Sequence, residues 1–197
     1  MHLYLMKKIA ILDRNGLSLT GIEHMLKDMP MLDCFFATQD TFRFNDILYR
    51  GFSIDGAVIS FYHGSPDSLL AINEFIASYG ANYLIVMLES RNKHLLNLIY
   101  CMNVSWVLFF DESIIQISRK INMIFSNKKT GDMTSRPGLL TTREIEVLTA
   151  LLGGLSTESV AKKMYLSIKT ISSHKKKALN KLGLTRFNQL LVSSLIN

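Results

Sequence analysis

The sequence predicts an α/β domain with a parallel sheet, followed by a small all-α domain. In the first two thirds of the chain, short apolar segments alternate with segments of helical periodicity. This alternation is typical of parallel strands that are covered by helices on both faces. In residues 139–197, apolar residues recur at helical spacing between strong start and stop signals, which predicts a cluster of helices.

The first part of the chain contains five predicted strands. The strands are expected at 8–13, 34–38, 55–61, 82–88 and 104–110, and helical segments at 17–26, 68–79, 93–102 and 113–125. With a fifth helix whose bounds the sequence does not delimit, five strands and five helices in about 120 residues match a flavodoxin-like, doubly wound domain.

Four helices are predicted after residue 139. Thr141 and Glu144 have the spacing of a capping box, and the helix that they open ends at Gly153. A short helix runs from Ser156 to about residue 164, a basic helix occupies 167–182, and a fourth helix starts near residue 186. Two helices joined by a tight turn, the second one basic, form a helix-turn-helix, whose second helix enters the major groove of DNA.

The charge of the chain is concentrated in the same region. Residues 139–197 hold nine Lys and Arg, three Glu and no Asp, whereas basic and acidic residues are equal in number before them. The net charge of +6 therefore belongs to the last 59 residues. A lysine-rich helix alone is usually only a solvated face, but a basic helix inside a helix-turn-helix is the footprint of a nucleic-acid-binding unit.

Four motifs follow one another in this region: Thr-Thr-Arg-Glu-Ile-Glu-Val-Leu, Gly-Gly-Leu-Ser, Val-Ala-Lys-Lys-Met and Ser-Ile-Lys-Thr-Ile-Ser-Ser-His-Lys-Lys-Lys-Ala-Leu-Asn-Lys-Leu-Gly. In this order they resemble the LuxR/FixJ/NarL-type DNA-binding domain. The resemblance covers residues 139–196, and segment 167–183 is most similar to the Rcs phosphorelay response regulators. It implies that the chain binds double-stranded DNA. The bases are contacted by Ser172, Ser173 and Lys176, and the DNA backbone is contacted by Lys169, Thr170, Lys175 and Lys177. His174 lies nearer the buried edge, where a packing role is expected.

The same resemblance implies a dimer that forms through the fourth helix. The residues assigned to this contact are Phe187, Leu190, Leu191 and Ser194. The apolar residues among them equally fit the core of the small domain, and one residue can serve both purposes.

Placed before such a domain, the α/β unit resembles the receiver domain of a response regulator. Aspartyl phosphorylation requires an acidic pair for Mg²⁺, a nucleophilic carboxylate, a hydroxyl and a lysine at fixed strand ends. The matching positions hold Asp13 and Arg14 for the acidic pair, Ser60 or, with a one-residue shift, Phe61 for the nucleophile, Leu88 or Glu89 for the hydroxyl, and Phe110 for the lysine. Only Asp13 remains of the five groups. It is expected to be a capping or salt-bridged acid, with a functional carboxylate as the alternative.

These substitutions predict a pseudo-receiver that is not phosphorylated, with Phe61, Leu88 and Phe110 filling the pocket. Regulation then comes from a partner, the expression level or a ligand. The resemblance to Rcs-allied regulators implies pairing with a phosphorylatable regulator, so an adaptor that forms a heterodimer is the alternative to a homodimeric regulator. In this chain, the surface of the receiver-like domain that contacts the partner is expected at the first helix and the last strand-helix pair.

We expect an atypical receiver domain at 1–126, a flexible linker at 127–138 and the DNA-binding domain at 139–197. No glycine-rich phosphate loop, nucleophile-base pair or carboxylate cluster occurs, which argues against an enzyme, and the scattered histidines predict no metal or cofactor. The apolar runs are far shorter than the roughly 20 residues that span a bilayer, and no cleavable leader opens the sequence, so a cytoplasmic location is expected. Cys34 and Cys101 are expected to be buried free thiols.

Overall fold

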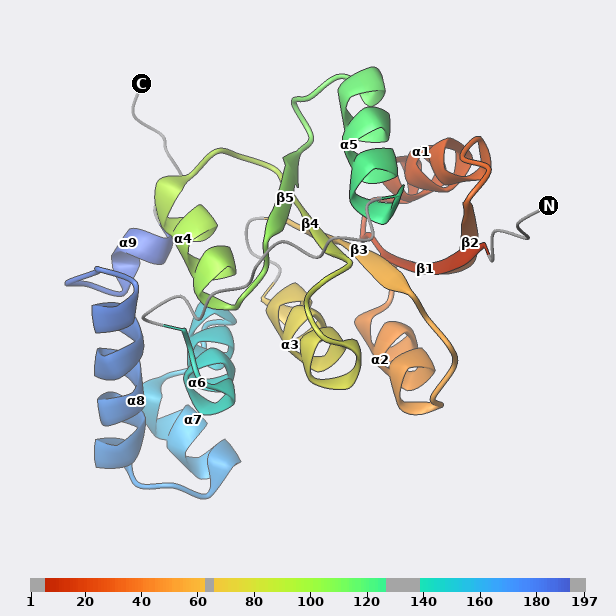
Figure 1. The fold of residues 1–197 in the computed structure, drawn as a ribbon. Coiled ribbons are helices and arrows are strands. Elements are labelled where there is room, and N and C mark those ends of the chain that lie inside the picture. Colours follow the sequence, from red (N-terminus) through yellow and green to blue (C-terminus); the bar gives the residue numbers. More distant parts are fainter. Residues whose placement is uncertain (1–5, 63–65, 127–138, 192–197) are drawn as a thin grey trace.

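The computed structural model describes residues 6–62, 66–126 and 139–191 (Figure 1). The first part contains a five-stranded parallel sheet with the order β2-β1-β3-β4-β5. The strands are β1 (Lys7–Leu12), β2 (Leu32–Thr38), β3 (Gly56–Phe61), β4 (Leu84–Leu88) and β5 (Trp106–Phe109). This order and the helices on both faces confirm the predicted doubly wound fold.

In the described part of this domain, five helices cover the sheet. They are α1 (Gly16–Lys27), α2 (Thr41–Tyr49), α3 (Asp67–Tyr79), α4 (Lys93–Cys101) and α5 (Ile114–Ser126). Helices α1 and α5 lie on one face, and α2, α3 and α4 lie on the other (Figure 1). Successive residues of β1 alternate between the two apolar clusters, with Ile9 on the α1 side and Ala10 on the α2 side. This two-sided burial explains why the strands read as continuous apolar runs.

Within residues 139–191 there are four helices, as the sequence predicted. They are α6 (Thr142–Leu152), α7 (Thr157–Met164), α8 (Ile168–Lys181) and α9 (Asn188–Leu191). The capping box is present: Thr141 accepts a hydrogen bond from the Glu144 amide, and the Glu144 carboxylate accepts one from the Thr141 amide. Both α6 and α7 pack against α8.

Two helices differ from the expectation. Helix α2, which the sequence analysis did not delimit, is opened by Asp40, whose carboxylate accepts the amides of Phe42 and Arg43. Helix α9 begins at Asn188, two residues after the expected start near residue 186, and the Gln189 side chain accepts the amide of Arg186 just before it.

The two parts of the chain are in contact. Helix α3 packs against α6, and α4 packs against α9. The Asn97 side chain donates a 2.8 Å hydrogen bond to the carbonyl of Leu182, and the Leu140 amide donates one of 2.8 Å to the carbonyl of Cys101. The bond from Asn97 lies just after the carboxyl end of α8, whereas Lys169, Ser172 and Ser173 near its amino-terminal end are exposed. The linker expected at 127–138 lies outside the described residues.

Within the described ranges, no helix is both long enough and apolar enough to span a bilayer.

Candidate nucleic-acid interface

Helix α8 has defined ends and one buried face. Its first turn is capped by the Ser167 hydroxyl, which accepts a 3.0 Å hydrogen bond from the Thr170 amide. Just beyond its carboxyl end, Gly183 has a φ of +65°, a left-handed conformation that glycine adopts without a steric penalty. Ile171, Ala178 and Leu179 are buried against the other helices. The opposite face is therefore held toward solvent.

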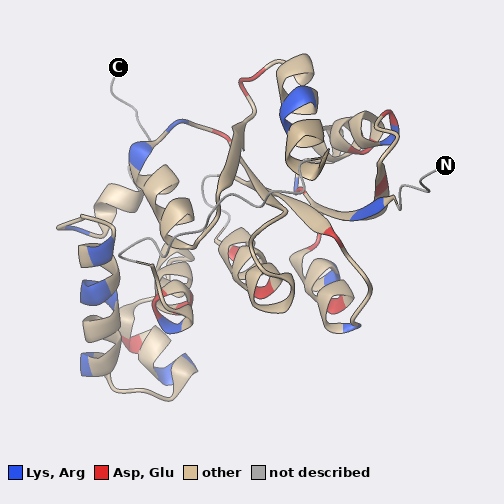
Figure 2. Ribbon diagram, viewed as in Figure 1, with Lys and Arg blue, Asp and Glu red and all other residues tan. Residues whose placement is uncertain are grey.

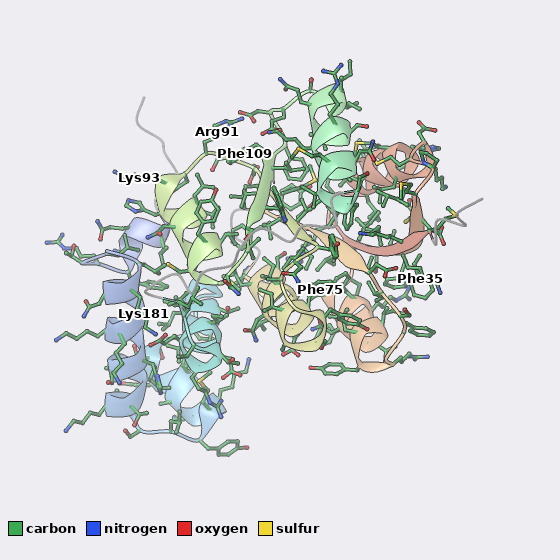
Figure 3. The ribbon with its side chains drawn as sticks, in the orientation of Figure 1. Phe35, Phe75, Arg91, Lys93, Phe109 and Lys181 are labelled. Carbon is green, nitrogen blue, oxygen red and sulfur yellow. The ribbon has the colours of Figure 1, made fainter. Side chains whose placement is uncertain are left out.

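An ion pair anchors the carboxyl end of α8 to the start of α6. Lys181 is the last residue of α8 (Figure 3). Its ammonium lies 2.7 Å from the Glu144 carboxylate and donates a second bond, 2.9 Å long, to the carbonyl of Leu139. Burial of Glu144 favours its neutral form, but the bonds from Lys181 and from the Thr141 amide outweigh it and lower the pKa of Glu144. The pair fixes the orientation of α8 in its domain.

The outer face of α8 presents lysines and small hydroxyls. Lys169, Ser172, Ser173, Lys176 and Lys177 are exposed, and basic residues follow one another along the helix (Figure 2). The two remaining predicted contacts are half-buried. The Thr170 hydroxyl lies 2.8 Å from that of Ser167, and the Lys175 ammonium lies 5.2 Å from the centre of the Phe187 ring. His174 is half-buried as well, at the edge where the sequence placed it.

The residues assigned to a dimer contact are only partly described. Leu190 is 8% exposed and belongs to an apolar cluster that includes Leu98 and Ile99 of α4. Phe187 is half-buried against the same cluster. The side chain of Leu191 and the whole of Ser194 lie outside the described residues. In this arrangement Leu190 faces the chain itself.

At the carboxyl ends of β1 and β3, one buried carboxylate gathers four hydrogen-bond donors. Asp13 is fully buried. One of its oxygens accepts the hydroxyls of Ser18 (2.6 Å) and Ser60 (2.7 Å), and the other accepts the hydroxyl of Tyr62 and the amide of Asn15. Of the two residues considered for the nucleophile position, Ser60 is the one whose side chain meets Asp13. The carboxylate is thus fully engaged by the protein's own donors.

The filling of this pocket differs from the expectation. Phe61 and Leu88 belong to the apolar cluster that packs against α3, and Glu89 is exposed just after β4. The ring that covers Asp13 belongs to Tyr62, which stacks on Phe110 with 5.2 Å between ring centres. Burial, together with the bond to Asp13, raises the pKa of Tyr62.

Sequence reasoning missed Tyr62, although its place directly after a buried strand pointed to this edge of the sheet. Arg14, the other member of the former acidic pair, is exposed beside the cluster. Among the described residues, no three His, Cys, Asp or Glu side chains are grouped as metal ligands. Cys34 and Cys101, which were expected to be buried, are half-buried, and the structure pairs neither of them in a disulfide within the described residues.

Comparison with known proteins relates the second part of the chain to a family of regulators. The family described as bacterial regulatory proteins, luxR family, matches residues 138–193. The fimbriae Z protein of Escherichia coli is 39% identical over 74 residues, which are 38% of this chain and 35% of that protein. The oxygen regulatory protein NreC of Staphylococcus aureus is 36% identical over 59 residues, 30% of this chain and 27% of NreC. The match thus spans about a third of these relatives.

A solved structure of RcsB is similar in fold to most of this chain. RcsB from Salmonella enterica serovar Typhimurium, solved bound to promoter rprA in the presence of a phosphomimetic, superposes with a TM-score of 0.63. The superposition covers 94% of this chain and 96% of RcsB at 20% sequence identity, so the likeness is one of fold. The motifs around α6 to α8 thus lie in a segment, residues 138–193, that matches the luxR family of bacterial regulatory proteins, and this segment follows an α/β domain whose fold is similar to that in RcsB.

Proposed function

We propose that this chain is a transcription regulator that binds promoter DNA through α8 without being phosphorylated. Ser172, Ser173 and Lys176 face the bases of the major groove, where hydroxyls bond several base edges and lysine favours guanine. Lys169, Thr170, Lys175 and Lys177 contact the phosphates, which position the protein but carry no sequence information. The observation that supports this most directly is the exposed, carboxylate-free outer face of α8 within a luxR-family domain.

The arrangement of the two parts is compatible with this role. Their contacts involve the carboxyl end of α8 through Leu182, whereas Lys169, Ser172 and Ser173 are exposed. DNA can therefore approach α8 without a prior separation of the two parts. We also propose the division into residues 1–126, 127–138 and 139–197.

The proposed independence from phosphorylation rests on the surroundings of Asp13. A carboxylate that already accepts four hydrogen bonds has no oxygen lone pair well placed for Mg²⁺. Ser60 stands where a carboxylate nucleophile is required, and its hydroxyl is committed to Asp13. The α/β domain then works as a structural and interaction module.

A selection experiment tests DNA binding. The full chain is used to select duplexes from a random-sequence pool, and its affinity for the selected duplex and for a scrambled one is measured at several salt concentrations. Specific binding with a marked salt dependence is expected, since each phosphate contact releases condensed counterions. Failure to enrich any duplex contradicts the proposed function.

Two variants separate the roles on α8. Lys176→Ala should lower the affinity for the selected duplex about tenfold or more and relax its specificity, since a base contact contributes about 1–3 kcal/mol. Lys175→Ala should weaken both duplexes similarly and reduce the salt slope by about one unit. Lys27→Ala, on the exposed surface of α1, is the control and should change neither. Unchanged affinity in Lys176→Ala at moderate salt means that α8 is placed wrongly.

A second candidate function is an adaptor that pairs with another response regulator. Exposed apolar side chains on α1 and α5 favour it: Leu17 is 88% exposed and Ile114 is 75% exposed. They line a hollow of about 370 Å³ with Met25 and Phe110. Light scattering separates the two candidates, because a homodimer that binds DNA alone supports the regulator, and a monomer that binds poorly supports the adaptor.

A further inference from the structure

The turn between α7 and α8 holds an aromatic residue in a conformation that does not favour one. Tyr165 has φ and ψ of 56° and 39°, in the left-handed region. There a residue with a Cβ is destabilised by about 1–2 kcal/mol, whereas Gly and Asn are tolerated. The side chain is 95% exposed, so its ring buries almost nothing against the rest of the chain. Packing within the protein therefore does not account for a tyrosine at this position.

Tyr165 is part of an exposed apolar surface. Leu166 is 37% exposed and Ile168 is 51% exposed, and we call these three residues the turn patch. They border a hollow of about 490 Å³ whose other walls come from Ala161 and Lys162 of α7. Large apolar side chains gathered at a surface hollow indicate a site where another molecule binds and covers them.

The charges around the turn patch define that molecule. The amino-terminal end of α8 carries the partial positive charge of a helix dipole, and Lys162, Lys163 and Lys169 are exposed nearby. Glu158 stands on the rim of the hollow and is the carboxylate among the described residues that line it. The matching partner is anionic and also offers apolar surface, as DNA does through its phosphates, deoxyriboses and thymine methyl groups.

The turn patch is also continuous with the proposed recognition face. Ile168 and Ser172 are four residues apart on α8, so their side chains lie on the same side of the helix, one turn apart. A duplex that meets Ser172 in its major groove passes the amino-terminal end of α8 and the turn before it.

We propose that the turn patch is a second DNA-reading surface, in which Tyr165 lies against the sugar-phosphate backbone and Ile168 contacts a thymine methyl group beside the base read by Ser172. The inference rests on the proposed DNA binding and extends the contact beyond the polar residues of α8. It assigns Ile168 a part in sequence choice, because the thymine methyl is the apolar group that the major groove displays.

Tyr165→Asn tests the first contact without threatening the fold, since Asn tolerates the left-handed backbone. The thermal midpoint of the variant should equal or exceed that of the wild type. Its affinity for the duplex selected by the wild type should fall about tenfold, while the salt slope stays the same, because no charge is removed. Phe42→Ala removes a ring that is 87% exposed on α2 and serves as the matched control, with unchanged affinity expected.

Ile168→Ala tests the second contact. It should weaken binding to the selected duplex about fivefold, an effect that vanishes on duplexes in which the contacted thymine is replaced by uracil, which lacks the methyl group. Equal affinity of wild type and Tyr165→Asn overturns the backbone contact. A loss in Ile168→Ala that persists on uracil duplexes overturns the methyl contact. If the wild type binds no duplex at all, the proposed function fails and this inference fails with it.

Discussion

Asp13→Asn tests whether Asp13 has become a structural residue. In the wild type, one carboxylate oxygen accepts the hydroxyls of Ser18 and Ser60, and the other accepts Tyr62 and the Asn15 amide. An asparagine keeps one carbonyl oxygen and turns an NH₂ group toward two former donors. The serine hydroxyls can reorient and accept from that group, so the bonds persist without the help of the negative charge.

The size of the effect follows from the number of bonds. A hydrogen bond to a charged group contributes about 1.5–3 kcal/mol and a neutral one about 0.5–1.5 kcal/mol. Each bond therefore loses about 1–1.5 kcal/mol, and losing the charge from four bonds should lower the free energy of unfolding of the α/β domain by about 4–6 kcal/mol. If Asp13 were instead kept for Mg²⁺ binding and phosphate chemistry, Asp13→Asn should raise the free energy of unfolding, because neutralising the carboxylate would relieve an unfavourable burial of charge.

The assay is urea unfolding followed by tryptophan fluorescence. Trp106 on β5 is the single tryptophan of the sequence, so the signal reports the α/β domain alone. Asp55→Asn is the matched control: its exposed carboxylate accepts one amide hydrogen bond, from Lys8, and the change should cost less than about 1 kcal/mol. An Asp13→Asn variant as stable as the wild type, or more stable, refutes the structural role.

Three further predictions concern packing and ionisation. Gly56→Ala should destabilise the α/β domain by about 1–3 kcal/mol, since a Cβ there would lie 2.4 Å from the Phe125 ring. The added Cβ of Gly21→Ala on α1 would have no atom within contact distance, so this variant should be slightly more stable than the wild type. Urea unfolding of the two variants compares these effects. Glu144→Gln should lower stability by about 2–3 kcal/mol at neutral pH. Folding lowers the pKa of Glu144 below its value of about 4.3 in the unfolded chain. The stability difference between wild type and Glu144→Gln is therefore present above about pH 4.3 and should disappear as the pH falls through the pKa of Glu144 in the folded protein. Thermal unfolding measured as a function of pH tests this. Burial, with the Glu23 carboxylate, raises the pKa of the Cys34 thiol to about 11, so in a Cys101→Ala background its alkylation should be slow at pH 8 and accelerate up to that value.

Most of the fold could be predicted because its signals are local. Thr141 and Glu144 mark the start of α6 within four residues, and Ser167 and Gly183 mark the two ends of α8. The continuous apolar runs identified the buried strands, although the ends of β4 and β5 were placed one or two residues too far out. Helix ends fixed by side-chain caps from later residues, such as Gln189, were less visible.

The candidate sites were harder to foresee because they depend on distant residues. Ser60 and Tyr62 reach Asp13 only because β1 and β3 are adjacent and parallel in the sheet, which brings residues 47 and 49 positions apart into contact. The bond between Asn97 and Leu182 joins two surfaces whose pairing leaves no periodic trace in the sequence. The exposure of Tyr165 likewise follows from the left-handed turn that it occupies. No residue type near Tyr165 in the sequence indicates such a turn.

The most direct measurement is the affinity of the purified, untreated chain for its selected duplex, compared with the same sample after incubation with acetyl phosphate and Mg²⁺. The occupied Asp13 cluster and the exposed face of α8 predict tight binding in the untreated sample and the same dissociation constant after treatment. Binding that appears only after treatment, together with covalent attachment of phosphate to the chain, contradicts a phosphorylation-independent regulator.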